Sequence, residues 1–255
     1  MIEKDLHPKI LFLILILSVG AMTGCSLSPK QQAEIIPAQR TLSNDDSITY
    51  AMRIYDPIES FNRSTYKFNA NFDQYVFLPV VRGYEFVTPE LAQTGIDNFF
   101  SNLGELSNLT NSIFQLKPKS ALHAMSRFLI NSTLGIAGLW DHATSWEIFE
   151  YQEDFGQTLG HFGVGSGPYL VIPLLGPTNT RDGVGLLVDS MAYGVVYGAA
   201  FDFDNNTSGA VAFHTTRAIN TRKQTRFRYH QSGSPFEYDM VRYLYTQKRK
   251  LEIAK

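Results

Sequence analysis

The sequence has almost no cysteine and no excess of charge of either sign. Lys and Arg total 22 residues against 24 Asp and Glu residues in a chain of 255, and the one cysteine is Cys25. This balance excludes the basic surface that nucleic-acid binding requires, and a single thiol excludes a disulfide within the chain. Because 44% of the residues are hydrophobic, the chain can still bury a core and is not globally disordered.

Motifs of catalysis and metal binding are also lacking. The six histidines show no HExxH spacing. The glycine-rich residues 163–168 have Pro168 where a GxGxxG phosphate loop needs glycine, and Val164 where a GxSxG nucleophile elbow needs it. Residues 202–213 begin like a calcium loop but lack its glycine at position six and its glutamate at position twelve. The sequence therefore predicts no metal, no cofactor and no enzymatic activity.

The long apolar run of the chain lies at its N-terminus. Residues 10–19 (ILFLILILSV) are typical of a signal-peptide core, and the run is shorter than the roughly 20 residues that span a bilayer. Residues 22–25 (MTGC) then resemble a lipobox, the site cut by the lipoprotein signal peptidase, with Met where Leu is usual. We therefore predict that residues 1–24 are a signal peptide and that Cys25 is lipidated.

The position of Cys25 favours lipidation over a free thiol left by ordinary cleavage, because the only cysteine stands at the predicted cleavage site. Lipoproteins of this kind carry three acyl chains, and several chains anchor firmly where a single chain binds marginally. An Asp after the cysteine would favour the inner membrane, so Ser26 predicts the outer membrane. Residues 25–50 have no apolar period and are predicted to be the lipidated cysteine and a flexible tether.

Residues 51–255 are predicted to form one all-α domain of short amphipathic helices. Asp56, Pro57 and Glu59 provide an N-cap, a proline at N1 and an acid at N3. Pro79 interrupts the apolar stripe that follows at helical spacing, which is formed by Ile58, Phe61, Phe68, Phe72 and Tyr75. The same signals predict further helices over residues 88–103, 106–116, 122–133, 178–193, 209–229 and 238–251. No apolar run after Cys25 reaches spanning length.

The apolar stripes of these helices have two interpretations. In a soluble helical bundle they would pack together as the core, which is the usual meaning of such periodicity and is favoured by the pattern alone. In amphipathic helices that lie at a bilayer interface they would face the lipid. The periodicity does not decide between the two.

A series of motifs, in order along the chain, resembles those of the VacJ/MlaA lipoprotein family. Residues 56–63 (DPIESFNR) match its D-P-x-E-x-F-N-R signature, and residues 153–165 (EDFGQTLGHFGVG) give the longest match. In the closing block Phe236 stands where Asp is expected, so the last helix lacks its expected capping side chain. The other matching segments are residues 98–103, 127–141, 167–169 and 234–249.

The resemblance implies a ring of short amphipathic helices in the inner leaflet of the outer membrane, with a central channel. It implies association with a trimeric porin and the transfer of phospholipid misplaced in the outer leaflet to a soluble periplasmic carrier, which maintains lipid asymmetry. A ring in one leaflet needs no spanning helix. A path for phospholipid must be partly apolar and partly polar, because either end of the lipid is costly to expose to the wrong medium.

The first candidate site is the group Phe61, Asn62 and Arg63, predicted to line or gate the channel. Asn62 follows Phe61 by about 100° around the helix, which places it at the edge of the apolar stripe. Core packing is the alternative role for Phe61.

The second candidate site consists of glycines. Gly135 and Gly138 are predicted to form a hinge, and Gly163, Gly165 and Gly167 a flexible wall beside the channel. Ordinary turns that need a permissive backbone are the alternative at each of these positions.

Two other functions remain open at this stage. A lipid-anchored periplasmic scaffold, formed by a soluble helical bundle, is the main alternative to a lipid-transport channel. A lipid hydrolase or acyltransferase is less favoured, because Ser, His and Asp are plentiful but sequence order alone does not assemble a triad.

Overall fold

The computed structural model describes Arg40, Met52, residues 54–203 and residues 205–255. These residues belong to one compact unit, Pro37–Lys255. The predicted signal peptide and Cys25 lie outside the described residues, as does nearly all of the predicted tether. The unit is mostly helical with two short strands, so the predicted all-α class is confirmed.

The bounds of the helices are α2 Glu59–Phe72, η1 Asp73–Phe77, α3 Leu78–Val87, α4 Glu90–Phe114, α5 Pro118–Thr133, α6 His142–Ser145, α7 Phe155–His161, α8 Thr180–Phe201, α9 Thr207–Gln224 and α10 Glu237–Ala254. The predicted amphipathic segments are helical, but α3, α6 and α7 were not predicted, nor was the π-helical turn after α2.

Several predicted boundaries were wrong. The two helices predicted between residues 88 and 116 are one helix, α4, of 25 residues. Pro79 does not end a helix: the backbone stays helical from α2 through η1 into α3, and the π-helical turn η1 lies directly before the proline. Asp56 does not cap α2: the cap position is Ile58, and the Asp56 carboxylate accepts hydrogen bonds from Asn62, Tyr238 and Arg242.

Helix α8 is longer than the predicted segment. Gly194 and Gly198 do not interrupt it, and it continues to Phe201. With 22 residues and a mean hydropathy of 1.5, α8 is long and apolar enough to cross a membrane, and only 11% of its most apolar window is buried. The prediction that no segment after Cys25 reaches spanning length is therefore corrected, because that prediction read the two halves of α8 separately.

Strands β1 (Tyr169–Ile172) and β2 (Gly176–Asn179) form an antiparallel hairpin in register Tyr169 to Asn179. The sequence did not predict this hairpin. Tyr169 and Val171 from β1 pack with Tyr66 of α2 and Tyr238 of α10 in the small buried apolar cluster of the unit.

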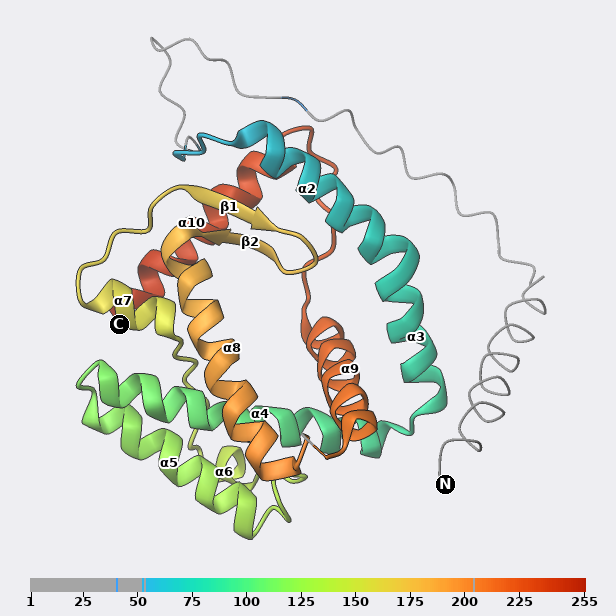
Figure 1. Cartoon of the computed structure of the whole chain (residues 1–255), viewed down its shortest axis with the longest axis vertical. Coiled ribbons are helices and arrows are strands. Elements are labelled where there is room, and N and C mark those ends of the chain that lie inside the picture. The colour runs from blue at the N-terminus through green and yellow to red at the C-terminus, as the bar shows by residue number, and fades with distance from the viewer. Residues whose placement is uncertain (1–39, 41–51, 53, 204) are drawn as a thin grey trace, which may run out of the picture. The chain divides into compact units, whose positions relative to one another are not determined.

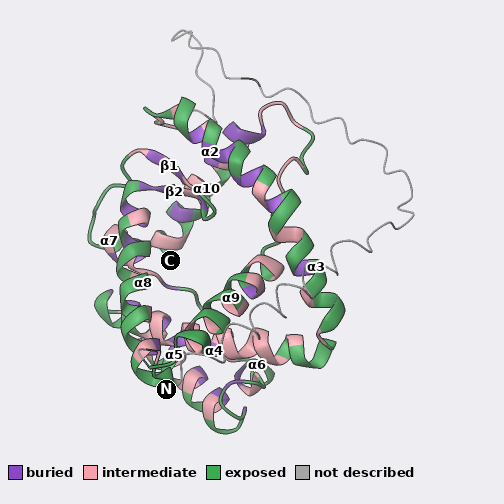
Figure 2. Cartoon of the chain, turned by 45° about the vertical axis from the view of Figure 1, so that its right-hand side comes forward, coloured by how far each residue is buried: buried purple, intermediate pink, exposed green. Residues whose placement is uncertain are grey.

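Contacts between elements run in a closed circuit (Figure 1). From α2 the chain continues through η1 to α3; α3 packs on α9, α9 on α4, α4 on α7, α7 on α8, and α8 on β2, while β1 returns to α2. Helix α5 pairs with α4, and α10 contacts α7 and β2. Figure 2 shows many exposed residues along α3, α8 and α9, whereas α7 is mostly buried or intermediate.

Candidate functional site

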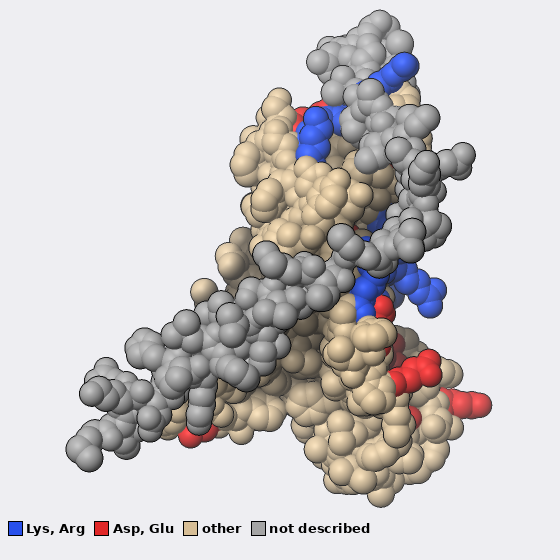
Figure 3. All heavy atoms as spheres, turned by 90° about the vertical axis from the view of Figure 1, so that its right-hand side faces the viewer, with Lys and Arg blue, Asp and Glu red and all other residues tan. Residues whose placement is uncertain are grey.

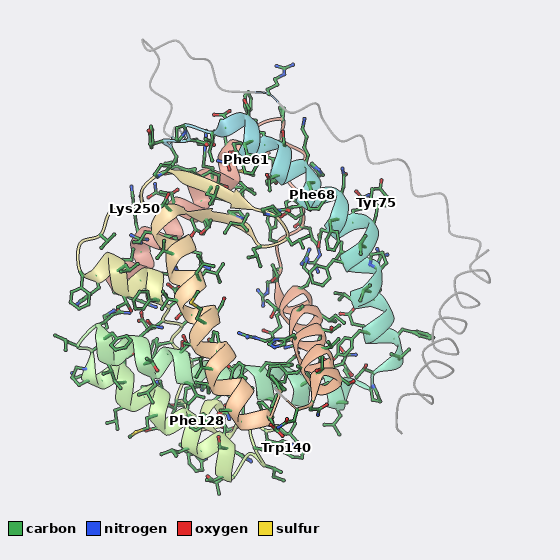
Figure 4. The ribbon with its side chains drawn as sticks, viewed as in Figure 1. Phe61, Phe68, Tyr75, Phe128, Trp140 and Lys250 are labelled. Carbon is green, nitrogen blue, oxygen red and sulfur yellow. The ribbon has the colours of Figure 1, made fainter. Side chains whose placement is uncertain are left out.

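The buried face of α2 carries asparagines beside Tyr66 and Ala70, and large apolar side chains lie on the exposed face. Asn62 and Asn69 are 0% and 3% exposed, whereas Phe61 and Phe68 are 54% and 51% exposed. Phe61, Phe68 and Tyr75 are spaced seven residues apart and follow one side of α2 and η1 (Figure 4). The predicted apolar stripe therefore exists, but it does not form a core.

The same inversion holds for α4 and α5. In α5 the predicted stripe of Leu122, Met125 and Leu129 is exposed, while Arg127 and Asn131 are buried. The buried side chains of α4 are polar and lie at spacings of three or four, namely Asn102, Glu105, Asn108, Asn111 and Ser112. Asn102 and Glu105 bond to α5, whereas Asn111 bonds to Thr158 of α7 and Asp189 of α8. A soluble bundle buries its apolar stripes, so these helices have the distribution expected where lipid replaces water as the outer medium.

Arg127 and Glu105 form the centre of the polar contact between α4 and α5. Arg127 Nε donates to Glu105 Oε1, and Arg127 Nη2 lies 3.2 Å from Asp141 Oδ2. Asn108 also donates to Glu105, at 3.0 Å. Burial raises the pKa of the Glu105 carboxyl, and the hydrogen bonds from Asn108 and Arg127 oppose this rise without reversing it.

A second polar network joins α10 to α7 and α8. Arg249 donates to Asp154 at 2.7 Å and to Asp182 at 2.8 Å. Burial alone would raise the pKa of Asp154, but the Arg249 guanidinium and the hydrogen bonds from Gln157 together hold the pKa below its ordinary value. Ionised Asp154 therefore stabilises the folded protein at a pH above about 4, the ordinary pKa of a carboxyl. As the pH falls through the lowered pKa, Asp154 takes up a proton and this stabilisation is lost.

Uncharged surface is extensive on the face seen in Figure 3, where Lys, Arg, Asp and Glu side chains occupy only a few places. Several exposed apolar side chains come from each of α4, α5 and α8, among them Leu91, Leu129, Leu187, Met191 and Val195. An exposed apolar area of this extent marks an interaction surface in a folded protein.

Comparison with known proteins identifies the family. The MlaA lipoprotein model matches residues 54–252, more than half of the chain. The chain belongs to the MlaA lipoprotein family. The resemblance seen in the motifs from residue 56 to residue 249 is thereby confirmed.

Individual MlaA relatives agree with this assignment. The chain is 34% identical over 200 residues to the intermembrane phospholipid transport system lipoprotein MlaA of Escherichia coli K12, covering 76% of each chain. It is 33% identical to an uncharacterised protein of Rickettsia prowazekii, covering 74% of this chain and 76% of the relative. A structure solved in work on the structural basis for maintenance of bacterial outer membrane lipid asymmetry matches with a TM-score of 0.62 and 29% identity, over 78% of this chain and all of that one.

The signature motif of the MlaA family places Asn62 at a contact between α2 and β1. Its amide donates to Tyr169 O at 3.0 Å and accepts from Val171 N at 2.9 Å. One residue before it, Phe61 points to the exposed side of α2, so core packing does not explain Phe61. The gating role of Asn62 stays a prediction, and its contacts give it a structural role as a link between α2 and the hairpin.

Arg63, the third residue of the predicted group, faces α10. Its Nη2 lies 2.9 Å from Asp239 Oδ2, its Nε lies 2.7 Å from Glu59 Oε1, and its guanidinium stacks 4.2 Å from the centroid of the Tyr238 ring. Arg63 therefore fixes the position of α2 on α10. As expected, Phe236, at the N-cap position of α10, provides no capping side chain.

The five predicted glycines fall into two environments. Gly135 and Gly138 are buried in the turn after α5, and Gly138 has a φ of +90°. Gly163, Gly165 and Gly167 are exposed in the connection between α7 and β1. The hinge and the flexible wall stay predictions.

Replacing Gly135 by Ala is expected to destabilise the protein by roughly 2 kcal/mol, since overpacking of this kind costs about 1–3 kcal/mol. A Cβ atom at Gly135 would lie 2.1 Å from Trp140 O and 2.4 Å from Asn131 O, both backbone atoms. Gly165→Ala is the matched control, because no atom lies within 4 Å of its added Cβ. Unfolding of the detergent-solubilised variants would measure the difference, and equal stability of the two would contradict the packing role of Gly135.

Sequence reasoning missed the buried polar residues of α4 and α5. Their signal was present, because Asn102, Glu105 and Asn108 repeat every three residues along α4. Asn69 was also missed as a hairpin contact, although it donates to Ile172 O and accepts from Leu174 N. Within the described part of the chain, no group of three His, Cys, Asp or Glu side chains is arranged to hold a metal ion.

Proposed function

We propose that this chain is an outer-membrane lipoprotein of an intermembrane phospholipid transport system. It would remove phospholipid misplaced in the outer leaflet and pass it to a periplasmic carrier, which maintains lipid asymmetry. Family membership supports the transport role, because the named relative from E. coli is a lipoprotein of such a system.

The observation that carries the proposal is the inverted distribution of polar and apolar side chains. Apolar stripes of α2, α4, α5 and α8 are exposed, and polar side chains meet between the helices. Because the elements follow a closed circuit, an apolar exterior in contact with acyl chains could surround a more polar path. Such an arrangement would accommodate both ends of a phospholipid.

The lipid anchor at Cys25 would hold the ring on the periplasmic side of the outer membrane, in its inner leaflet. A trimeric porin would be its partner in that membrane, and a soluble periplasmic lipid carrier would receive the phospholipid. The proposal requires no nucleophile, metal or cofactor in this chain.

The decisive experiment is the quantification of outer-leaflet phospholipid in a strain that lacks this chain. We expect outer-leaflet phospholipid to rise and to be restored by the wild-type gene but not by Cys25→Ser, which cannot be acylated. An unchanged outer leaflet in the deletion strain would overturn the proposed function.

A second measurement distinguishes the proposed lipid-transport protein from a lipid-anchored periplasmic scaffold. A Cys25→Ala protein exported by another signal would lack the lipid, and the exposed apolar stripes predict that it still requires detergent or lipid to stay dispersed. A soluble, monomeric protein in plain buffer would favour the scaffold instead.

A further inference from the structure

Helix α9 carries three cationic side chains, and they have different partners. Arg222 Nη2 lies 2.7 Å from Asp73 Oδ2, and Lys223 Nζ lies 2.9 Å from Asp97 Oδ2. These two ion pairs attach α9 to its neighbours η1 and α4. Arg217, by contrast, has no carboxylate at ion-pair distance among the described residues.

Arg217 instead stacks on aromatic rings of α8. Its guanidinium carbon lies 4.4 Å from the centroid of the Tyr193 ring and 5.6 Å from that of the Tyr197 ring. Stacking uses the flat face of a guanidinium and leaves its N–H donors, which lie in the plane, free for hydrogen bonds. Within the described residues no protein oxygen accepts a hydrogen bond from the Arg217 side chain.

A half-buried guanidinium with a fixed plane and open donors suits a phosphate group. Arginine binds phosphate oxygens in pairs through this planar fork, and the aromatic rings hold the fork in one orientation before the ligand arrives. An unpaired cation that is partly removed from water is costly, so an anionic ligand at this position would relieve that cost.

The surroundings indicate which phosphate compound fits. Tyr193 and Tyr197 form the side of α8 that faces Arg217, while Met191 and Val195 of the same helix are 70% and 74% exposed. Tyr193 and Val195 are two residues apart and so lie about 200° apart around the helix. A phosphate at Arg217 thus lies one helix diameter from an open apolar face.

We propose that Arg217, held on Tyr193 and Tyr197, binds the phosphodiester of a phospholipid headgroup as the lipid passes between α8 and α9. This inference rests on the proposed function and adds to it the residue that selects phosphorylated lipids.

The test compares two short-chain lipids that differ only in their headgroup, dioctanoylphosphatidylglycerol and dioctanoylglycerol, binding to the purified full chain in neutral detergent. Arg217→Gln is expected to weaken binding of the phosphorylated lipid by at least about tenfold, the loss expected for one charge-assisted hydrogen bond. Binding of dioctanoylglycerol should not change. Arg226→Gln, which removes an exposed arginine just after α9, should leave both affinities as in the wild type.

Two results would overturn the inference. Equal affinity of Arg217→Gln and wild type for the phosphorylated lipid would reduce Arg217 to a link between helices, and an equal loss for both lipids would indicate general loss of packing. Should Arg217→Gln fail to fold by circular dichroism, Arg217→Lys must retain the preference for the phosphorylated lipid.

Inorganic phosphate, used as a competitor, distinguishes a site for the phosphodiester of a lipid headgroup from a site for free phosphate. Failure of inorganic phosphate to displace the lipid would support a lipid site, and displacement by inorganic phosphate would show a site for free phosphate and overturn the lipid assignment. A wild-type protein that binds neither lipid would instead contradict the proposed function itself.

Discussion

Arg127→Met is expected to destabilise the protein by roughly 3–5 kcal/mol, the cost of breaking a buried ion pair by removing one partner. Glu105 is completely buried, and Arg127 is its only cationic partner within the described residues. Without Arg127 the carboxylate would either remain charged and unpaired or take up a proton. Asp141 would lose the same guanidinium.

The measurement is the free energy of unfolding of detergent-solubilised variants. Lys119→Met is the matched control, because Lys119 is exposed in the same helix, α5, and its loss should change stability by less than about 0.5 kcal/mol. The double variant Glu105→Gln with Arg127→Met should recover part of the loss, since it leaves no buried charge at position 105. An Arg127→Met protein as stable as the Lys119 control would show that this network contributes little.

Deleting Phe61 and Asn62 together is expected to let phospholipid leak toward the outer leaflet and to act dominantly over the wild type. The deletion removes both bonds by which Asn62 attaches α2 to β1. It also turns the residues before it by about 200° relative to the rest of α2, so Glu59 no longer pairs with Arg63. Asn69 would remain attached to the hairpin. We therefore expect the protein to fold, with the part of the proposed channel wall formed by α2 displaced.

Cells that carry both copies provide the measurement, which is their outer-leaflet phospholipid. A simple loss of function would be recessive, whereas an open path would not be corrected by the wild-type copy. Phe61→Ala is the control, since Phe61 is on the exposed face and makes no link to β1. The gating role is wrong if the deleted form accumulates normally and the mixed strain still resembles the wild type.

Sequence periodicity located most helices but could not say which side of each faces outward. Ile58, Phe61 and Phe68 form a stripe at helical spacing whether water or lipid lies outside, and the same pattern fits both media. The family motifs, unlike the periodicity, favoured lipid as the medium that these stripes face. Arg217 was not singled out, because its contact with Tyr193 joins two helices and has no signature in local spacing.

The hairpin was missed for a different reason. Strand β1 has four residues and is followed by Pro173, so its apolar run is too short to separate from a buried helix segment. The contacts that stabilise it come from Asn62 and Asn69, more than 100 residues away in the chain. Long-range polar contacts of this kind are not visible in a single sequence.

Asn62 and Asn69 also determine what covers the edge of the small sheet at β1. A strand at the edge of a sheet presents unpaired peptide groups that can recruit a strand from another molecule. The side-chain amides of Asn62 and Asn69 bond to Tyr169, Val171 and Ile172 of β1 and to Leu174 just after it, while α8 and α10 contact β2. Helix α2 thus takes the place of a third strand, which protects the hairpin from intermolecular strand addition.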